Sequence, residues 1–254
     1  MKRMLFVVAF VATIFTAQAW TALVDNASYI IARKYMTKQA LAEYDRLALL
    51  KESVDYKWVA DKTARATLNT DLRSTTTDEK DIVVRLEKAI EVLRNRANHT
   101  PREQYEAFVA VKNLVVALHT VSHVAIEGIE DSKADFSFTW TAGKEGSKKH
   151  EKRGTLTWHK LWSSNFCYWH QGWSSEYYAY DIDLRFGKQR ATLMQGNTRE
   201  WAHDMGVLVK PMYEWAQPGM VLANEPRLNL EDVHLNNVAK AGYRLAYLMN
   251  TILK

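Results

Sequence analysis

The sequence predicts a mostly α-helical protein with a small β portion. Apolar residues recur at intervals of three and four over most of the chain, as they do on one face of an amphipathic helix. Only residues 136–140 and 155–158 have the alternating, β-rich pattern of strands. Four prolines in 254 residues leave long stretches free of helix breakers. We therefore expect a single mostly α domain with a two-stranded β excursion.

The helices are expected in a definite order along the first half of the chain. Residues 23–50 have the spacing of an amphipathic helix or a helix pair. The threonine run at residues 75–77 is expected to cap a next helix, with Asp78 and Glu79 in its first turn and an apolar stripe over residues 82–93. These segments would form the first helical layers.

Pro101 suits the first position of a further helix, because proline lacks the N–H that is unpaired there anyway. This helix is expected to direct five side chains toward the interior, namely Phe108, Val111, Val115, Leu118 and Ser122. The two strands are separated by a basic, glycine-containing loop, residues 143–153, and the chain then returns to helical spacing.

Aromatic rings are dense between Trp158 and Tyr180. Buried aromatic rings build hydrophobic cores, whereas exposed rings can stack on unpaired bases. We expect about two-thirds of these rings in the core and the rest on a stacking or sugar-binding surface. The set comprises Trp158, Trp162, Phe166, Tyr168, Trp169, Trp173, Tyr177, Tyr178 and Tyr180.

The N-terminus has the three parts of a secretory signal peptide. Lys2 and Arg3 precede an apolar run at residues 4–15 and the small-x-small site Ala17-Gln18-Ala19. Residues 1–19 are therefore expected to be removed, and residues 20–254 to act in the secretory lumen or outside the cell. The apolar run is shorter than the roughly 20 residues of a membrane-spanning helix, and no later stretch is as apolar. No membrane span is expected after cleavage.

Composition adds few constraints on function. Cleavage of residues 1–19 would remove Lys2 and Arg3. The number of basic residues then falls from 34 to 32 against 29 acidic ones, so the net charge falls from +5 to about +3. Charge alone therefore does not indicate a nucleic-acid partner. Cys167 is the only cysteine, which excludes an intrachain disulfide. Acceptor patterns for N-glycosylation at Asn26 and Asn98 are consistent with export.

Four segments in order resemble the zinc-dependent, single-strand-specific nucleases, also called class I nucleases or 3'-nucleotidases, which are related in fold to bacterial phospholipase C. They are Trp20 after the signal peptide, Trp58-Val59-Ala60-Asp61, Trp201-Ala202-His203-Asp204, and the final helix at residues 239–250. The resemblance covers essentially the whole mature chain. It implies a helical zinc-nuclease-like fold and hydrolysis of phosphate esters by three zinc ions, whose ligands include the amine of the N-terminal tryptophan.

The resemblance also implies nine ligand positions, of which about half are retained. Four match, namely Trp20, Asp61, His123 and His159, and Asp25 replaces a histidine with a residue that can still ligate. The other four positions hold Asn69, Asn113, Ala117 and Ser163. Ala117 stands where the family has the carboxylate that bridges two zinc ions, and a methyl group cannot bind a metal.

A smaller zinc site remains open. His119 lies four residues before His123, a helical spacing that zinc proteins use, so His119, His123 and His159 can form a rebuilt site. The alternative is that these histidines are hydrogen-bonded core or cleft residues. Likewise Asp61 can be a salt-bridged carboxylate, and Trp20 can bury its indole against the first helix.

Two functions follow from these positions. The sequence favours a non-catalytic relative of the zinc nucleases that binds single-stranded nucleic acid, a nucleotide or an unidentified protein partner. The alternative is an active phosphodiesterase or 3'-nucleotidase with one or two metals at the retained positions. Two-metal catalysis needs ions roughly 3.5–4 Å apart, held by a shared or adjacent ligand. Ala117 stands where a carboxylate would bridge them. We therefore expect one zinc ion at most. A purely structural exported protein is a third reading that the sequence does not separate from the first.

Overall fold

The mostly α prediction is confirmed by the computed structural model, which describes residues 21–59, 63–129, 136–142, 152–170, 172–222 and 224–254. Its α-helices are α1 (Ala22–Lys34), α2 (Lys38–Leu49), α3 (Ile82–Arg94), α4 (Pro101–Leu118), α5 (Trp158–Ser163), α6 (Ser175–Phe186), α7 (Arg190–Leu193), α8 (Thr198–Trp215) and α9 (Asn224–Ile252). The strands are β1 (Ala66–Leu68), β2 (Val124–Ile126), β3 (Ser137–Ala142), β4 (Lys152–Thr157) and β5 (Val221–Leu222). Short 3₁₀ turns are η1 (Leu50–Glu52), η2 (Arg96–Asn98), η3 (Val121–His123), η5 (Asn165–His170) and η6 (Gly187–Gln189).

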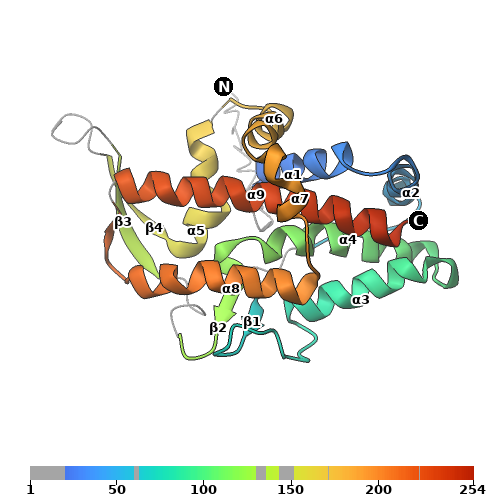
Figure 1. Cartoon of the computed structure of the whole chain (residues 1–254), viewed down its shortest axis with the longest axis horizontal. Coiled ribbons are helices and arrows are strands. Elements are labelled where there is room, and N and C mark those ends of the chain that lie inside the picture. Colours follow the sequence, from blue (N-terminus) through green and yellow to red (C-terminus); the bar gives the residue numbers. More distant parts are fainter. Residues whose placement is uncertain (1–20, 60–62, 130–135, 143–151, 171, 223) are drawn as a thin grey trace, which may run out of the picture.

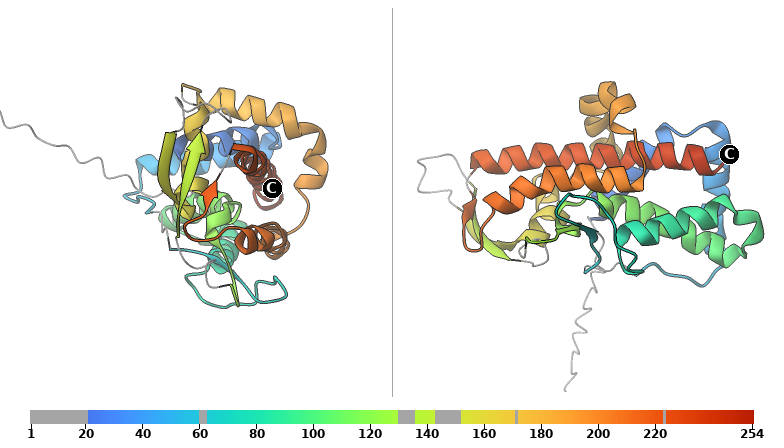
Figure 2. Two further views of the ribbon diagram at one scale, coloured as in Figure 1. Left: turned by 90° about the vertical axis from the view of Figure 1, so that its left-hand side faces the viewer. Right: turned by 60° about the horizontal axis from the view of Figure 1, so that its bottom comes forward.

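The long helices run roughly alongside one another, and the sheets lie at the margins (Figure 1). α9 passes through the middle of the view with α8 and α4 next to it, whereas β3 and β4 lie at one end. Two further views show the same arrangement from the side and from below (Figure 2). None of the described helices is both long enough and apolar enough to cross a membrane.

Of the two alternatives for residues 23–50, one helix or a helix pair, the structure has the pair, α1 and α2. Thr37 caps α2, because its side-chain oxygen accepts a hydrogen bond from the backbone N–H of Ala40 at 3.2 Å. The predicted cap of α3 is wrong: Asp81, rather than the threonine run at residues 75–77, begins this helix. The Asp81 carboxylate is buried and accepts from the N–H groups of Val83 and Thr67, at 2.8 and 2.7 Å. It therefore joins the start of α3 to β1.

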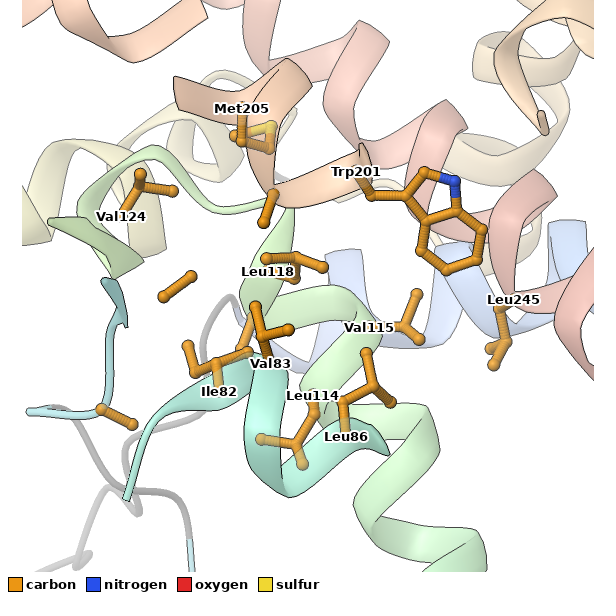
Figure 3. Close-up of a cluster of buried hydrophobic side chains, with 14 of the residues drawn as sticks. Ile82, Val83, Leu86, Leu114, Val115, Leu118, Val124, Trp201, Met205 and Leu245 are labelled. Atoms are coloured by element: carbon orange, nitrogen blue, oxygen red, sulfur yellow. The ribbon is translucent and has the colours of Figure 1, made fainter. Parts of the chain in front are cut away.

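α4 begins as predicted at Pro101, behind a capping box formed by Thr100 and Glu103. All five side chains expected inside are buried, but the helix ends at Leu118, so Ser122 lies in η3 and not on α4. Figure 3 shows this part of the core, in which α3 and α4 meet α8 and α9. The labelled residues are Ile82, Val83, Leu86, Leu114, Val115, Leu118, Val124, Trp201, Met205 and Leu245.

The β portion is larger than the predicted two strands. β3 and β4 do pair antiparallel, with Phe138 opposite Leu156, but β5 adds to β3 in parallel to give the order β4-β3-β5. In addition, β1 pairs in parallel with β2. The missed strands have three residues or fewer, which is too short for an alternating pattern to be visible in the sequence.

Gly242 sets the distance between α1 and α9. A Cβ atom at this position would lie 2.7 Å from Cγ2 of Ile31 and 3.0 Å from the backbone oxygen of Ser28. Next to it, Asp183 of α6 accepts hydrogen bonds from the hydroxyl groups of Tyr35 and Tyr243, at 2.9 and 2.7 Å. Three helices therefore meet at one close contact.

We expect the substitution Gly242→Ala to lower the free energy of unfolding by about 1–3 kcal/mol, because the new methyl group must displace the backbone of α1. Gly187→Ala is the matched control: its backbone is already helical and a Cβ there makes only ordinary contacts, the nearest at 3.4 Å. Chemical denaturation of both variants tests this expectation. Equal stability of the two would contradict it.

Candidate functional site

Most of the predicted site positions lie on α1, α4 and α5 and in the segment that follows α4. Asp25 is on α1, Asn113 and Ala117 are on α4, and His159 and Ser163 are on α5. His119 ends α4 and His123 ends η3. Trp20 and Asp61 lie outside the described residues.

The structure brings His123 and His159 together. Their ring centroids are 5.4 Å apart and the rings meet edge to face. His123 is buried, and its Nδ1 lies 2.8 Å from the carbonyl oxygen of Ala64. Since a carbonyl oxygen only accepts, Nδ1 carries the proton of this hydrogen bond. Zinc-binding histidines use this same arrangement, in which one nitrogen donates to a carbonyl and the other holds the metal. Ser163 follows His159 by one helical turn.

His119 is not available to this pair, because both of its ring nitrogens are hydrogen-bonded inside the protein. Nδ1 donates to the carbonyl oxygen of Val115 at 2.7 Å, and Nε2 accepts from Arg244 at 3.0 Å. Burial, together with the positive charge of Arg244, holds the pKa of His119 well below its usual value. His119 is therefore neutral and part of a structural network.

Arg244 connects this network to α8. It is almost fully buried, and besides His119 it donates to the carbonyl oxygen of Leu193 at 3.0 Å and to the carboxylate of Asp204. Its guanidinium also lies 5.4 Å from the ring of Trp201. Two residues of the Trp201-Ala202-His203-Asp204 segment thus hold the final helix in place.

The contact between α1 and α4 uses the side chain of Asn113 for structure. The hydroxyl of Tyr29 donates to Asn113 Oδ1 at 3.2 Å, and Asn113 Nδ2 donates to the carbonyl oxygen of Val109 at 2.8 Å. Burial, and secondarily the nearby charge of Asp25, raise the pKa of the Tyr29 hydroxyl well above its usual value. This hydroxyl therefore remains a proton donor. The ammonium of Lys112 lies over the same ring, 4.2 Å from its centre.

Two further positions at which the resemblance implies a ligand, Ala117 and Asn69, also have structural roles. Ala117 is buried in the main hydrophobic core. Asn69 closes the turn after β1, since its Oδ1 accepts from the N–H groups of Asp71 and Arg73 at 3.0 and 2.9 Å.

The residues present do not fit a close pair of bridged zinc ions. Ala117 presents a methyl group where the resemblance implies a bridging carboxylate, and the amide of Asn113 is already paired within the fold. Among the described residues, no group of three or more histidine, cysteine, aspartate or glutamate side chains is arranged to hold a metal. Of the predicted ligand positions that the structure describes, His123 and His159 are brought together as a pair of imidazoles.

The aromatic segment contributes to both core and surface. Of the seven rings whose side chains are described, four are buried and Trp173 is partly buried. Trp158, Trp162 and Phe166 form a chain with centroid distances of 5.6 and 5.2 Å. Tyr177 and Tyr180 are exposed. The side chains of Tyr168 and Trp169 lie outside the described set.

A second histidine cluster was missed by the sequence reasoning. His170 Nε2 lies 3.0 Å from Glu231 Oε1, and the buried ring of His234 stacks on Phe166 at 5.0 Å. Burial, and then the charge of His170, lower the pKa of His234 to about 3. The spacing of Glu231 and His234, three residues apart on one helix face, was the only sequence signal for this cluster.

Comparison with known proteins does not extend the family resemblance. No protein-family model matches the chain. No curated protein matches it either. The likeness to zinc nucleases therefore rests on the four sequence segments and their order.

We expect Arg244→Met to lower the free energy of unfolding by about 2–4 kcal/mol, because it leaves buried acceptors without their donor. Arg102→Met is the control, since Arg102 is exposed and pairs with Glu106 one turn away. Such a surface pair contributes little to stability because water screens it. Thermal and chemical unfolding measure both variants, and similar losses for the two would refute the central place of Arg244.

Stability is expected to fall as the pH decreases below about 6.5. His119 and His234 have lowered pKa values in the folded protein, so only the unfolded chain takes up their protons in this range. Each contributes a slope of about 1.4 kcal/mol per pH unit. Denaturation between pH 7 and pH 5 measures the slope. It should decrease in His234→Phe, whose ring can keep the stack on Phe166, and an unchanged slope would argue against a neutral buried His234.

Proposed function

We propose that the protein is an exported, non-catalytic binding protein built on the helical scaffold of the zinc-dependent nucleases. The observation that carries this proposal is the burial of Ala117 in the core at the position of the bridging carboxylate. A pair of closely spaced ions needs a shared or adjacent ligand to hold it. The methyl group of Ala117 supplies none.

The neighbouring positions support the same conclusion. The side chains of Asn113 and His119 are hydrogen-bonded within the fold. Asn113 bonds with Tyr29 and Val109, and His119 bonds with Val115 and Arg244. These bonds stabilise the contacts of α4 with α1 and α9. A protein that uses these residues for packing can keep the helical fold and lose the hydrolytic activity.

Single-stranded nucleic acid or a nucleotide is the ligand class that we propose, because the resemblance is to proteins that recognise these molecules. Export is supported by the signal-like first nineteen residues. It also agrees with the exposure of both predicted glycosylation acceptors, Asn26 and Asn98.

A hydrolase with one zinc ion is the second candidate, and the pairing of His123 with His159 favours it. These two imidazoles would hold the ion, with Ser163 one turn farther along α5. Bound there, zinc would supply Lewis acidity toward a phosphate oxygen. The chain's own contribution would be the hydrogen bond from His123 to Ala64, which orients the ring.

Zinc content separates the two candidates. We expect the purified mature protein, with its N-terminus determined by mass spectrometry, to retain less than one zinc per chain after chelation and re-addition. We also expect it to bind a labelled single-stranded oligonucleotide without cleaving it, and His123→Ala to leave this binding unchanged.

A stoichiometric, tightly held ion that is lost in His123→Ala and His159→Ala, but kept in His203→Ala, would reverse the order of the two candidates. His203 is the control because it is exposed and lies on α8. Absence of both binding and cleavage would point to a protein ligand instead.

A further inference from the structure

Lys112 of α4 places its side-chain nitrogen among three aromatic rings. Nζ lies 4.2 Å from the ring centre of Tyr29, 5.2 Å from that of Phe108 and 5.5 Å from that of Tyr44. These rings belong to α1, α4 and α2, and α4 packs against both of the other helices. Tyr29, Tyr44 and Phe108 therefore form an aromatic cage around one amine.

The aromatic cage is held in place by contacts of its own rings. Tyr44 and Phe108 are buried and meet edge to face, with their centroids 4.8 Å apart. The hydroxyl of Tyr29 donates to Asn113 Oδ1 at 3.2 Å, which fixes the third ring. Lys112 and Tyr29 are only partly buried. The cage therefore lies at the edge of the core, where the amine is in reach of small solutes.

The amine of Lys112 has no anionic partner in the part of the chain that the structure describes, since it makes no hydrogen bond or ion pair there. Arg33 brings a second positive charge to within 5.3 Å of the Tyr44 ring centre. The pKa of Lys112 is lowered to about 8, by burial first and then by the charges of Arg33 and Lys51, against the opposing charge of Asp25. Desolvation of this kind makes a lysine a better nucleophile.

A lysine amine reacts with an aldehyde or ketone without any further reagent. The nitrogen forms a bond to the carbonyl carbon, and the carbonyl oxygen leaves as water with two hydrogens of the ammonium. The product is a protonated imine, which keeps the positive charge but has one N–H in place of three. An ammonium needs three hydrogen-bond acceptors and loses them when water is excluded. Ring faces attract a cation but accept hydrogen bonds poorly, so the aromatic cage favours the protonated imine over the ammonium.

We propose that Lys112 and its aromatic cage form a binding site that captures small aldehydes or ketones reversibly as a protonated imine. The amine supplies the covalent bond, and the three rings hold the charge and the carbon chain of the ligand. This capture goes beyond the proposed binding of nucleic acid, because it requires neither a phosphate nor a metal.

Reductive trapping of the imine tests the proposal. The purified mature protein is incubated at pH 7 with limiting propanal and sodium cyanoborohydride, which reduces the imine to a stable secondary amine, and the labelled peptides are mapped by mass spectrometry. We expect Lys112 to be labelled at least about tenfold faster than Lys210, an exposed lysine of α8. Lys112→Arg keeps a cation in the cage but cannot form an imine, so this label should be lost while the protein stays folded.

Two substitutions of Tyr29 test the role of the aromatic cage. Tyr29→Phe keeps the ring and removes only the hydrogen bond to Asn113, so labelling of Lys112 should remain within about twofold of the original rate. Tyr29→Leu removes one ring face and admits water to the amine, so labelling should fall about fivefold or more. Thermal unfolding of both variants shows that each is folded under the labelling conditions.

Labelling of Lys112 at the same rate as Lys210 would overturn the proposal. So would equal labelling of the Tyr29→Phe and Tyr29→Leu variants, because the rings would then have no part in the capture. A label that persists on the same peptide in Lys112→Arg would assign the reaction to another amine and would overturn the proposal as well.

Discussion

The burial of one guanidinium constrains most of this fold. Arg244 lies on α9 at a depth where a positive charge must be hydrogen-bonded, and it finds its partners in His119, Leu193 and Asp204. These partners come from the end of α4, from α7 and from α8. A shift of any of these elements would leave a buried polar group unpaired. The long helices are therefore held in one relative position by polar contacts as well as by the apolar core.

The same network explains why the region expected to hold metals is organised for packing. His119 is oriented by Val115 and Arg244, and Asn113 by Tyr29 and Val109, so the histidine and the amide side chain serve the helix contacts. Ala117 completes this face of α4 with a small apolar group. Stability and metal binding would compete for these positions, and here the side chains favour stability. His123 and His159 are the exception, because their rings still meet beside α5.

Much of the helical framework was predictable because it depends on local spacing. The helical stretch that contains α1 and α2, the start of α4 and the pairing of β3 with β4 follow from apolar periodicity and from local signals such as Pro101. The start of α3 was misplaced because Asp81, which caps this helix, is held in position by a hydrogen bond from the backbone N–H of Thr67, fourteen positions earlier. β1, β2 and β5 were missed for a related reason, since such short strands exist only through their partners.

The sequence by itself determined the mostly α class and the core-facing residues of α4. Tertiary structure alone decided how the candidate ligand residues are used. Sequence spacing placed His119 with His123, but hydrogen bonds to Arg244, 125 positions away, take His119 out of that pair. It also left open which rings between Trp158 and Tyr180 are buried. Packing of α6 against α1 and α9 buries Tyr178, whereas Tyr177 and Tyr180 stay exposed. The physical reason is that periodicity reports which face of a helix is apolar, whereas burial and hydrogen bonding depend on distant parts of the chain.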